Sequence, residues 1–280
     1  MYRTSKPKIF RRKAPKPNEY LSTALNFTFN EYHIIFFPTF GYQTTIINTM
    51  ENRIKLLIVK FQNRLTHDEI KLFRGAVIHG LSQKNILYHN HMEEGFLYSY
   101  PLIQYKRIRN FAAFICLNEG TEVIEDFFSS YQPHFMIGNH PVTMKIDKLN
   151  PVFSCIEQTD KLMVTYHLTR WLPLNGKNYQ TYNQLEGIGE QILFLEKILV
   201  ANILACAKGL HIHLDKQLVC KIQKITGCYP VTHKTIKFMA FDLIFTANIL
   251  LPDYIGIGKN ASMDCGIIVQ TQEIHKKPIQ

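Results

Sequence analysis

The order in which strand-like and helix-like segments follow one another constrains this fold more than any other feature. After Met50 the pattern predicts strand, helix, strand, strand, helix and strand, the βαββαβ order of a ferredoxin-like domain. Many RNA-binding modules share this order, but the aromatic sheet-surface motif of such modules is absent here. The predicted segments are residues 53–61, 67–81, 96–104, 110–117, 121–128 and 141–146.

The first predicted helix has the clearest start signal. Thr66 and Glu69 form a capping box, in which each side chain can bond the other residue's backbone N–H. Apolar residues then recur at helical spacing, at Ile70, Phe73 and Val77. This predicts an amphipathic helix with one face on the core.

A second α+β unit is predicted after residue 150. Residues 162–171 alternate like a strand, and apolar residues from Ile188 to Cys206 then predict a long amphipathic helix, ended by Gly209 at the C′ position. Gly187 and Gly189 leave the start of this helix open. Residues 217–225 and 235–250 are predicted strands. The expected fold is therefore α+β, with two tandem ferredoxin-like (RRM-like) domains over residues 50–150 and 151–280.

The first 49 residues differ in charge from the rest of the chain. Seven Lys or Arg stand against Glu19 and Glu31, so this stretch contributes half of the formal charge of +10. We interpret residues 1–49 as a mis-called upstream region or a disordered tail, with Met50 as the real start. The alternative is a basic arm that grips RNA phosphates.

A glycine-rich loop over residues 251–266, LPDYIGIGKNASMDCG, follows the last long apolar run. Gly256, Gly258 and Gly266 permit a tight backbone with outward N–H groups, while Lys259 and Ser262 add a charge and a hydroxyl. This composition is typical of a phosphate-binding loop, and equally of an ordinary loop joining two strands. Neither a G-x-G-x-x-G fingerprint nor a Walker A sequence is present.

Composition narrows the classes of partner and of site. With a pI of about 9.2, the chain favours a polyanion, nucleic acid ahead of a membrane surface. The six cysteines form no C-x-x-C pair and sit mostly in apolar runs, which argues against a zinc site and for a cytoplasmic protein with reduced thiols. No segment has the length and apolarity of a membrane span, so we expect no membrane partner.

Histidines offer a route to acid–base chemistry. His89 and His91 stand in a loop after the first helix, and an imidazole titrates near neutral pH, so it can act as a general base. The other readings are that the two cap loop backbone, or that they bind a metal with Glu93 or Glu94. For His79 we expect a structural role within the helix. His211 and His213, a further histidine pair, are expected on one face of a strand.

Four separated stretches of the sequence resemble the CRISPR-associated repeat-processing endoribonuclease, the sixth Cas protein, in the subfamily with its own characteristic C-terminal domain. They are LYHNH (87–91), YSYPLIQYK (98–106), NILACAKGL (202–210) and LPDYIGIGKNAS (251–262). The resemblance covers residues 50–269. It implies a tandem ferredoxin-like protein that binds the repeat hairpin of a CRISPR precursor transcript. It also implies metal-independent cleavage that leaves a 2′,3′-cyclic phosphate and a 5′-hydroxyl, without a cofactor.

The resemblance further assigns roles. His89 or His91 would be the catalytic base. The RNA-binding residues would be Gly256, Gly258, Lys259, Ser262, Gly266 and Lys106. Other subunits of a CRISPR complex are further expected partners.

One position departs from the family's glycine pattern. Asp264 puts a negative charge where phosphates are expected, which weakens binding unless the carboxylate turns away or caps a backbone N–H. This departure leaves a second hypothesis open, a non-catalytic RNA-binding subunit.

Overall fold

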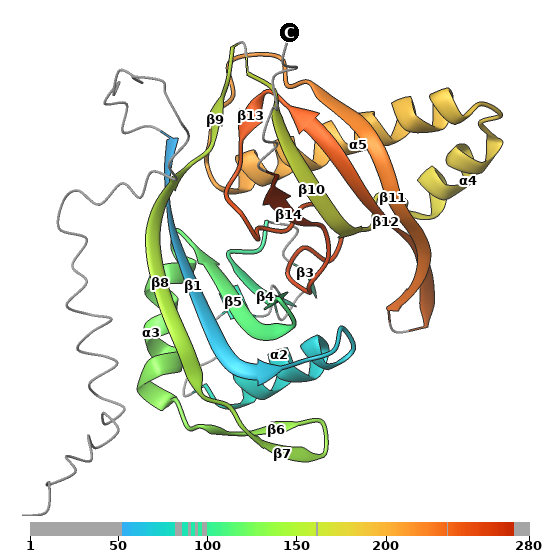
Figure 1. The fold of residues 1–280 in the computed structure, drawn as a ribbon. Coiled ribbons are helices and arrows are strands. Elements are labelled where there is room, and N and C mark those ends of the chain that lie inside the picture. The colour runs from blue at the N-terminus through green and yellow to red at the C-terminus, as the bar shows by residue number, and fades with distance from the viewer. Residues whose placement is uncertain are drawn as a thin grey trace, which may run out of the picture.

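The computed structural model of the protein has two halves, each built on a β-sheet (Figure 1). The predicted start at Met50, the basic residues 1–49 and His89 lie outside the described residues, and of His91 only the backbone is described. The structure describes residues 52–81, 86–88, 91–92, 95–96, 100–160, 162–233 and 235–271.

The N-terminal half is a four-stranded antiparallel sheet with spatial order β4-β5-β1-β8. With helices α2 and α3 between the strands, this is the ferredoxin-like arrangement that the sequence predicts. The main elements are β1 (Arg53–Arg64), α2 (Glu69–His79), β4 (Ile103–Ile108), β5 (Phe111–Leu117), α3 (Gly120–Ser130) and β8 (Ile146–Cys155). Shorter ones are η2 (Ile86–Tyr88), β2 (His91–Met92), β3 (Gly95–Phe96), β6 (His134–Ile137) and β7 (His140–Thr143).

Alternation along β1 divides its side chains between two cores. Val59 and Phe61 belong to the core beneath α2 and α3, whereas Ile54 and Leu56 belong to a core that includes the second half of the chain. Both faces of this sheet are therefore covered at its upper end, one by helices and the other by the second domain. The capping box forms as predicted, with Thr66 N donating to Glu69 Oε2 at 2.7 Å.

The last strand of the N-terminal half differs from the prediction. Residues 141–146 were expected to return to the sheet, but residues 141–143 belong to a separate β6–β7 hairpin, and Ile146 pairs with Phe61 of β1. The returning strand is β8, which pairs with β1 from Ile146 to Cys155, with a register shift next to Lys148. The domain boundary expected at Pro151 therefore falls inside strand β8, where Pro151 lies opposite Leu57 of β1. The strand accepts a proline because β8 is at the edge of the sheet, where a missing backbone N–H breaks no pairing.

The C-terminal half is also a four-stranded antiparallel sheet, with order β11-β12-β10-β14. Helix α5 is present as predicted, but Gly209 is its last residue and Leu210 its C-cap, so Gly209 is not the expected C′ residue. None of the described helices is long and apolar enough to cross a bilayer. His211 and His213 lie in a loop and not in the expected strand. The elements are β9 (Glu157–Gln158), β10 (Val164–Trp171), α4 (Gly176–Gln184), α5 (Ile188–Gly209), β11 (Cys220–His233), β12 (Ile236–Ala247), β13 (Ile249–Leu250) and β14 (Ile267–Gln270).

The two halves share strand order but not helix content. In the N-terminal half α3 connects the third strand to the fourth, whereas in the C-terminal half the glycine-rich loop makes the corresponding connection between β12 and β14. That loop runs back to the junction of the two sheets, where it meets β4 (Figure 1).

Candidate functional site

The glycine-rich loop adds itself to the edge of the N-terminal sheet. β4 is an edge strand, so the backbone groups on its outer side need partners. Tyr105 N donates to Ser262 O at 2.8 Å, and Asp264 N donates to Tyr105 O at 3.0 Å. Loop and strand are therefore joined by backbone hydrogen bonds across the domain junction.

Two glycines of the loop are required by a positive φ angle together with a close contact. Gly266 has φ +60°, and a Cβ there would lie 1.9 Å from Ile257 O. Gly258 has φ +76°, and its Cβ would lie 2.4 Å from the Asn202 Oδ1 atom. Such distances exclude any side chain, so these glycines fix the path of the loop.

The N–H groups of two loop glycines are already used inside the protein, which corrects the expectation that they face RNA. Gly256 is buried and donates to Gln104 Oε1 at 2.8 Å. Gly266, also buried, donates to Arg170 O at 3.0 Å. Partly or fully exposed positions among the predicted RNA contacts of the loop are Gly258, Lys259 and Ser262.

Lys106 was predicted to bind RNA, but its side chain is fully buried beneath the loop. Its Nζ donates to Ala261 O at 2.6 Å and to Cys265 O at 3.3 Å. Burial lowers the pKa of Lys106 to about 8, with the nearby Asp264 carboxylate acting in the opposite direction. The lysine therefore holds the loop against β4 and cannot reach a phosphate from this position.

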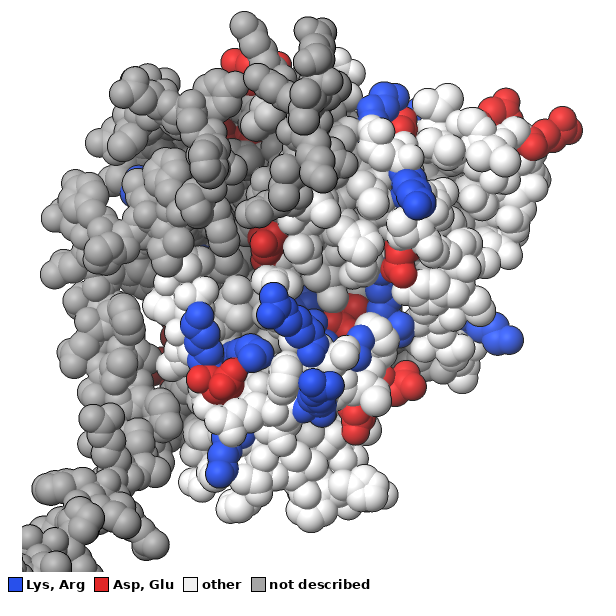
Figure 2. All heavy atoms as spheres, in the orientation of Figure 1, with Lys and Arg blue, Asp and Glu red and all other residues white. Residues whose placement is uncertain are grey.

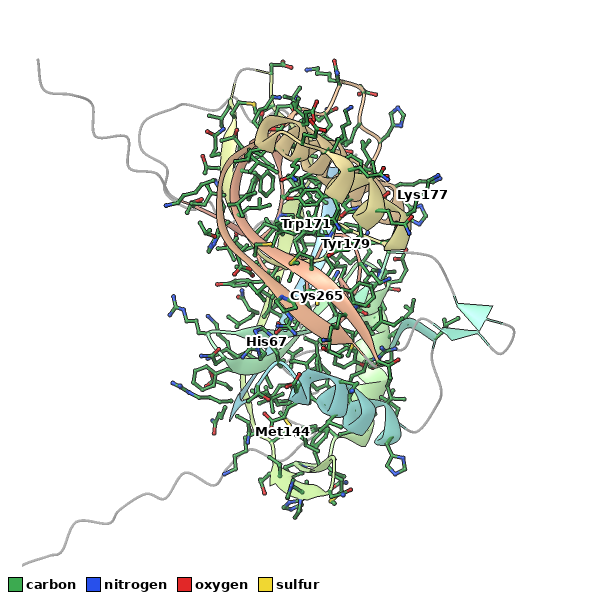
Figure 3. The ribbon with its side chains drawn as sticks, turned by 90° about the vertical axis from the view of Figure 1, so that its right-hand side faces the viewer. His67, Met144, Trp171, Lys177, Tyr179 and Cys265 are labelled. Atoms are coloured by element: carbon green, nitrogen blue, oxygen red, sulfur yellow. The ribbon has the colours of Figure 1, made fainter. Side chains whose placement is uncertain are left out.

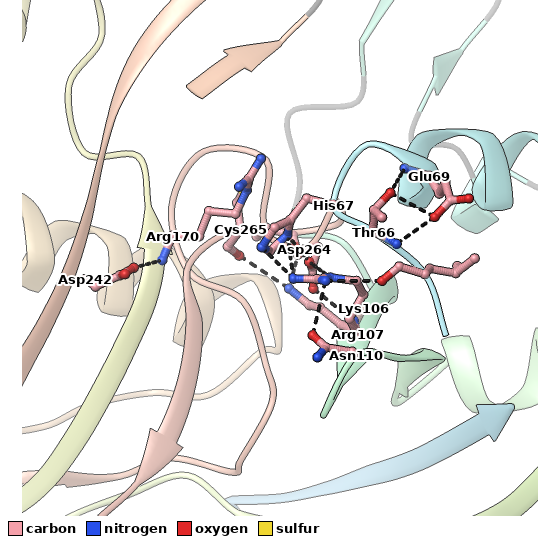
Figure 4. Close-up of polar contacts among 12 residues, drawn as sticks. Thr66, His67, Glu69, Lys106, Arg107, Asn110, Arg170, Asp242, Asp264 and Cys265 are labelled. Atoms are coloured by element: carbon pink, nitrogen blue, oxygen red, sulfur yellow. Dashed lines mark hydrogen bonds and ion pairs between the residues drawn. The ribbon is translucent and has the colours of Figure 1, made fainter. Parts of the chain in front are cut away.

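Asp264 caps and pairs with Arg107 (Figure 4). Arg107 N donates to Asp264 Oδ1 and Arg107 Nε to Asp264 Oδ2, both at 2.9 Å. His67 Nδ1 lies 2.6 Å from the same Oδ2 atom. Burial acts to raise the pKa of Asp264, but the hydrogen bonds from His67 and Arg107 outweigh it and hold this pKa below its ordinary value.

We call His67, Arg107 and Asp264 the clasp. Only 2% of the Asp264 side chain is exposed, so its charge is compensated inside the protein and does not face the solvent. The carboxylate has turned away from the surface and capped a backbone N–H, which removes the repulsion of phosphates expected from the sequence. The clasp also ties the loop to the segment before α2 and to β4.

Sequence reasoning did not single out His67 or Arg170. His67 lies inside the capping-box sequence, a signal for the start of a helix and not for a site. A small groove lies between the start of α2, the end of β10, the β11–β12 hairpin and the loop; it is lined by His67, Asp68, Ile70, Lys71, Arg170, Val231, Thr232, Asn260, Met263 and Cys265. Figure 3 shows His67 and Cys265 close together at this junction.

Arg170 supplies positive charge to that groove. Its backbone has φ +52°, held by a 2.6 Å hydrogen bond from its N–H to Asp242 Oδ1. Within the described part of the chain no carboxylate pairs with its guanidinium group. An anion in the groove would therefore meet an uncompensated cation.

The histidine loop is described only at its anchor. Tyr88, the residue before His89, is buried, and its carbonyl accepts from the Tyr105 hydroxyl at 3.2 Å. His79 lies exposed at the last turn of α2, as a surface residue of the helix. Among the residues described, no group of three His, Cys, Asp or Glu side chains could hold a metal ion; the candidate ligands Glu93 and Glu94 lie outside that set.

Comparisons with known proteins were made for sequence and structure. A family model of the Cas6b N-terminal domain matches residues 52–154, and one of the Cas6b C-terminal domain matches residues 158–271. An uncharacterized protein of Methanocaldococcus jannaschii is 35% identical over 112 residues, which are 40% of this chain and 75% of that protein.

Two solved structures resemble the whole described fold. A crystal structure of Cas6b superposes with a TM-score of 0.71 at 25% identity, over 78% of this chain and 100% of that chain. A crystal structure described as the CRISPR RNA processing endoribonuclease Cas6b gives a TM-score of 0.61 at 23% identity, with the same coverage. Sequence models and fold thus agree on both halves, in the same order.

Proposed function

Since this chain belongs to the Cas6b family of CRISPR RNA-processing proteins, we propose that it is an endoribonuclease that cuts CRISPR precursor RNA within the repeat hairpin. Mature guide RNAs would be the product. The match of both halves to the two domains of one family carries this proposal. The repeat hairpin is the proposed ligand, and other subunits of a CRISPR complex are further candidate partners.

The proposed chemistry is an internal transesterification. His89 or His91 removes the proton from the ribose 2′-hydroxyl, and that oxygen attacks the adjacent phosphorus. The bond from phosphorus to the 5′-oxygen breaks, and a second group, acting as a general acid, protonates the leaving oxygen. The ends are a 2′,3′-cyclic phosphate and a 5′-hydroxyl, and the balance needs neither water nor a metal ion.

Tyr105 supports a shared site for the histidines and the glycine loop. Its hydroxyl holds the carbonyl of Tyr88, one residue before His89, while its backbone N–H holds the carbonyl of Ser262. One residue of β4 thus contacts the anchors of both segments. In this proposal a nucleotide bound over the edge of β4 contacts both segments.

The exposed part of the loop is the proposed contact for the RNA backbone. Lys259 is exposed, and its Nζ lies 4.4 Å from the centre of the Phe238 ring. Ser262 and Gly258 are partly exposed on the same loop. Backbone and side-chain contacts of this kind fix the position of phosphates without reading sequence.

Incubation of the full chain with a repeat hairpin in EDTA tests the chemistry. We expect cleavage, with a 2′,3′-cyclic phosphate on the upstream product. A matched RNA with a 2′-deoxy residue at the cut position should bind equally well and stay intact, because it lacks the nucleophile. A requirement for added metal, or cleavage of the deoxy RNA, would refute this mechanism.

Single variants His89→Ala and His91→Ala then identify the base. A general base typically contributes about 10²–10⁴ to a rate, so one variant should lose that much while RNA affinity is unchanged. The same assay detects a non-catalytic RNA-binding subunit, which would retain the hairpin and give no product. Asp264, which had suggested that alternative from the sequence, is paired with Arg107 inside the clasp.

A further inference from the structure

A basic surface separate from the glycine-rich loop lies on the N-terminal sheet, on the face that carries no helix. Lys60 lies opposite Ala113 of β5 and Lys148 of β8, and Arg64 lies opposite Phe111. Residues paired across antiparallel strands direct their side chains to the same face. We call Lys60, Arg64, Phe111 and Lys148, together with Arg109 of the adjoining β4–β5 turn, the sheet-face patch.

An aromatic ring organises two of the cations in this patch. Lys60 Nζ lies 4.5 Å from the centre of the Phe111 ring, and Arg64 Cζ lies 5.1 Å from it. Both distances are within the range of cation–π attraction, which favours these side chains over the sheet. Phe111 itself is partly exposed, so part of the ring is open to a ligand.

The charge of the patch is poorly compensated. Four cations stand against Asp147, which pairs with Lys60 at 2.7 Å. Arg64, Arg109 and Lys148 are exposed, and no ion pair involving them is found among the described residues. Figure 2 shows Lys and Arg side chains gathered over the centre of the face that contains this sheet.

The patch is continuous with the loop site. Lys106 also lies opposite Ala113, so the row of Lys60 and Lys148 continues under the glycine loop. From the clasp, Arg107 Nη1 donates to Asn110 Oδ1 at 3.2 Å, at the tight turn that joins β4 to β5. A strand of RNA that leaves the loop site can therefore pass over this turn onto the patch.

We propose that the sheet-face patch binds the single-stranded RNA that flanks the repeat hairpin. This inference rests on the proposed function and adds a second contact for the same substrate. A flat surface that combines cations with a partly exposed ring suits an unpaired strand, because phosphates meet the cations and an unstacked base can lie on a ring or a guanidinium plane. A duplex keeps its bases stacked inside and would use the charges alone.

The test compares two charge-reversed proteins. The patch variant carries Arg64→Glu and Lys148→Glu, and the control carries Lys177→Glu and Lys197→Glu, the same change of charge on α4 and α5. Lys177 and Lys197 are exposed, and Figure 3 places Lys177 away from the junction marked by His67. Both are measured as full chains against a repeat hairpin with a 2′-deoxy cut position, with and without an unpaired flank of roughly eight nucleotides.

We expect the flank to raise the affinity of the wild type and the control by about tenfold and that of the patch variant by less than twofold. With the flanked RNA, the log–log salt dependence of the patch variant should be shallower by about 1.4, because each phosphate of a single strand that a cation neutralises adds about 0.7 to the slope. All three proteins should bind the bare hairpin alike.

Three results overturn the inference. The flank could add nothing for the wild type while the bare hairpin is still bound and, with an intact 2′-hydroxyl, cut, which leaves the proposed function standing. Patch variant and control could lose the same affinity, which would make the effect one of overall charge. Failure of the wild type to bind any hairpin would contradict the proposed function, and the patch inference with it.

Discussion

The two halves of the molecule have the same strand order but differ in how the third strand reaches the fourth. In the N-terminal half α3 makes this connection and covers the sheet with apolar side chains such as Ile124 and Phe127. In the C-terminal half residues 251–266 make it without a helix. A helix satisfies its own backbone, whereas a loop must find partners elsewhere.

Some of those partners lie within the C-terminal half, such as Arg170 O for Gly266 N, but others come from β4 of the other domain, which explains where the candidate site lies. Tyr105, Lys106 and Arg107 of β4 all bond to the loop, through backbone, ammonium and guanidinium groups in turn. The conformation of the loop therefore depends on contacts from both domains. Its stability and the position of its exposed residues depend on a few contacts that can be changed one at a time.

The largest expected effect on stability is that of Gly266→Ala, because a side chain at this position is incompatible with the conformation of the loop. The new Cβ would lie 1.9 Å from Ile257 O at a position with φ +60°. We expect a loss of about 4 kcal/mol in the free energy of unfolding, measured by urea denaturation. The control is Gly189→Ala in α5, where nothing lies within 4 Å and a gain of roughly 0.5 kcal/mol is expected. Equal effects at the two glycines would mean that the loop is not held as described.

The clasp is expected to have the next largest effect. Asp264→Ala leaves the Arg107 guanidinium, only 15% exposed, without its carboxylate, and breaking such a pair costs about 3 kcal/mol. Glu122→Ala removes the partner of Lys55 in an exposed pair and should cost less than about 0.5 kcal/mol. In a double-mutant cycle, Arg107→Met should recover part of the loss caused by Asp264→Ala. Additive losses would show that the two side chains act independently.

Lys106→Met should change how stability depends on pH. The pKa of Lys106 is lowered from 10.5 to about 8 in the folded protein, so between these values the unfolded chain binds more protons. Stability of the wild type relative to the variant should therefore rise, by roughly 2 kcal/mol, as pH increases from 7 to 10. Subtracting the variant removes the contributions of cysteines and tyrosines that titrate in the same range. A flat difference would mean that Lys106 is solvated.

Local patterns were enough to predict most elements of the fold. The spacing of apolar residues predicted α5, although Gly209 lies inside its last turn and not after it. Thr66 with Glu69 placed the start of α2 two residues early, at His67. The β6–β7 hairpin was missed because residues 141–143 are as strand-like as β8 itself, and local propensity does not choose between pairing partners.

The site was less predictable because its contacts join residues far apart in sequence. Asp264 and Arg107 are 157 positions apart, and nothing near either one indicates that the carboxylate is capped and paired. Lys106 was predicted to bind RNA because it lies in a stretch that resembles the family. In the structure it is buried in an edge strand beneath the loop, where its ammonium group binds loop carbonyls. A glycine motif predicts a tight loop; which N–H groups remain exposed depends on the partner strand.

Single-turnover cleavage of a repeat hairpin in EDTA, by the wild type and by the His89→Ala, His91→Ala double variant, tests the central claim most directly. If the loop and the histidine segment meet over β4 on one scissile nucleotide, the wild type will cut and the double variant will bind the hairpin with the same affinity but form no product. Cleavage by the double variant, or by the wild type only after metal is added, would contradict the account.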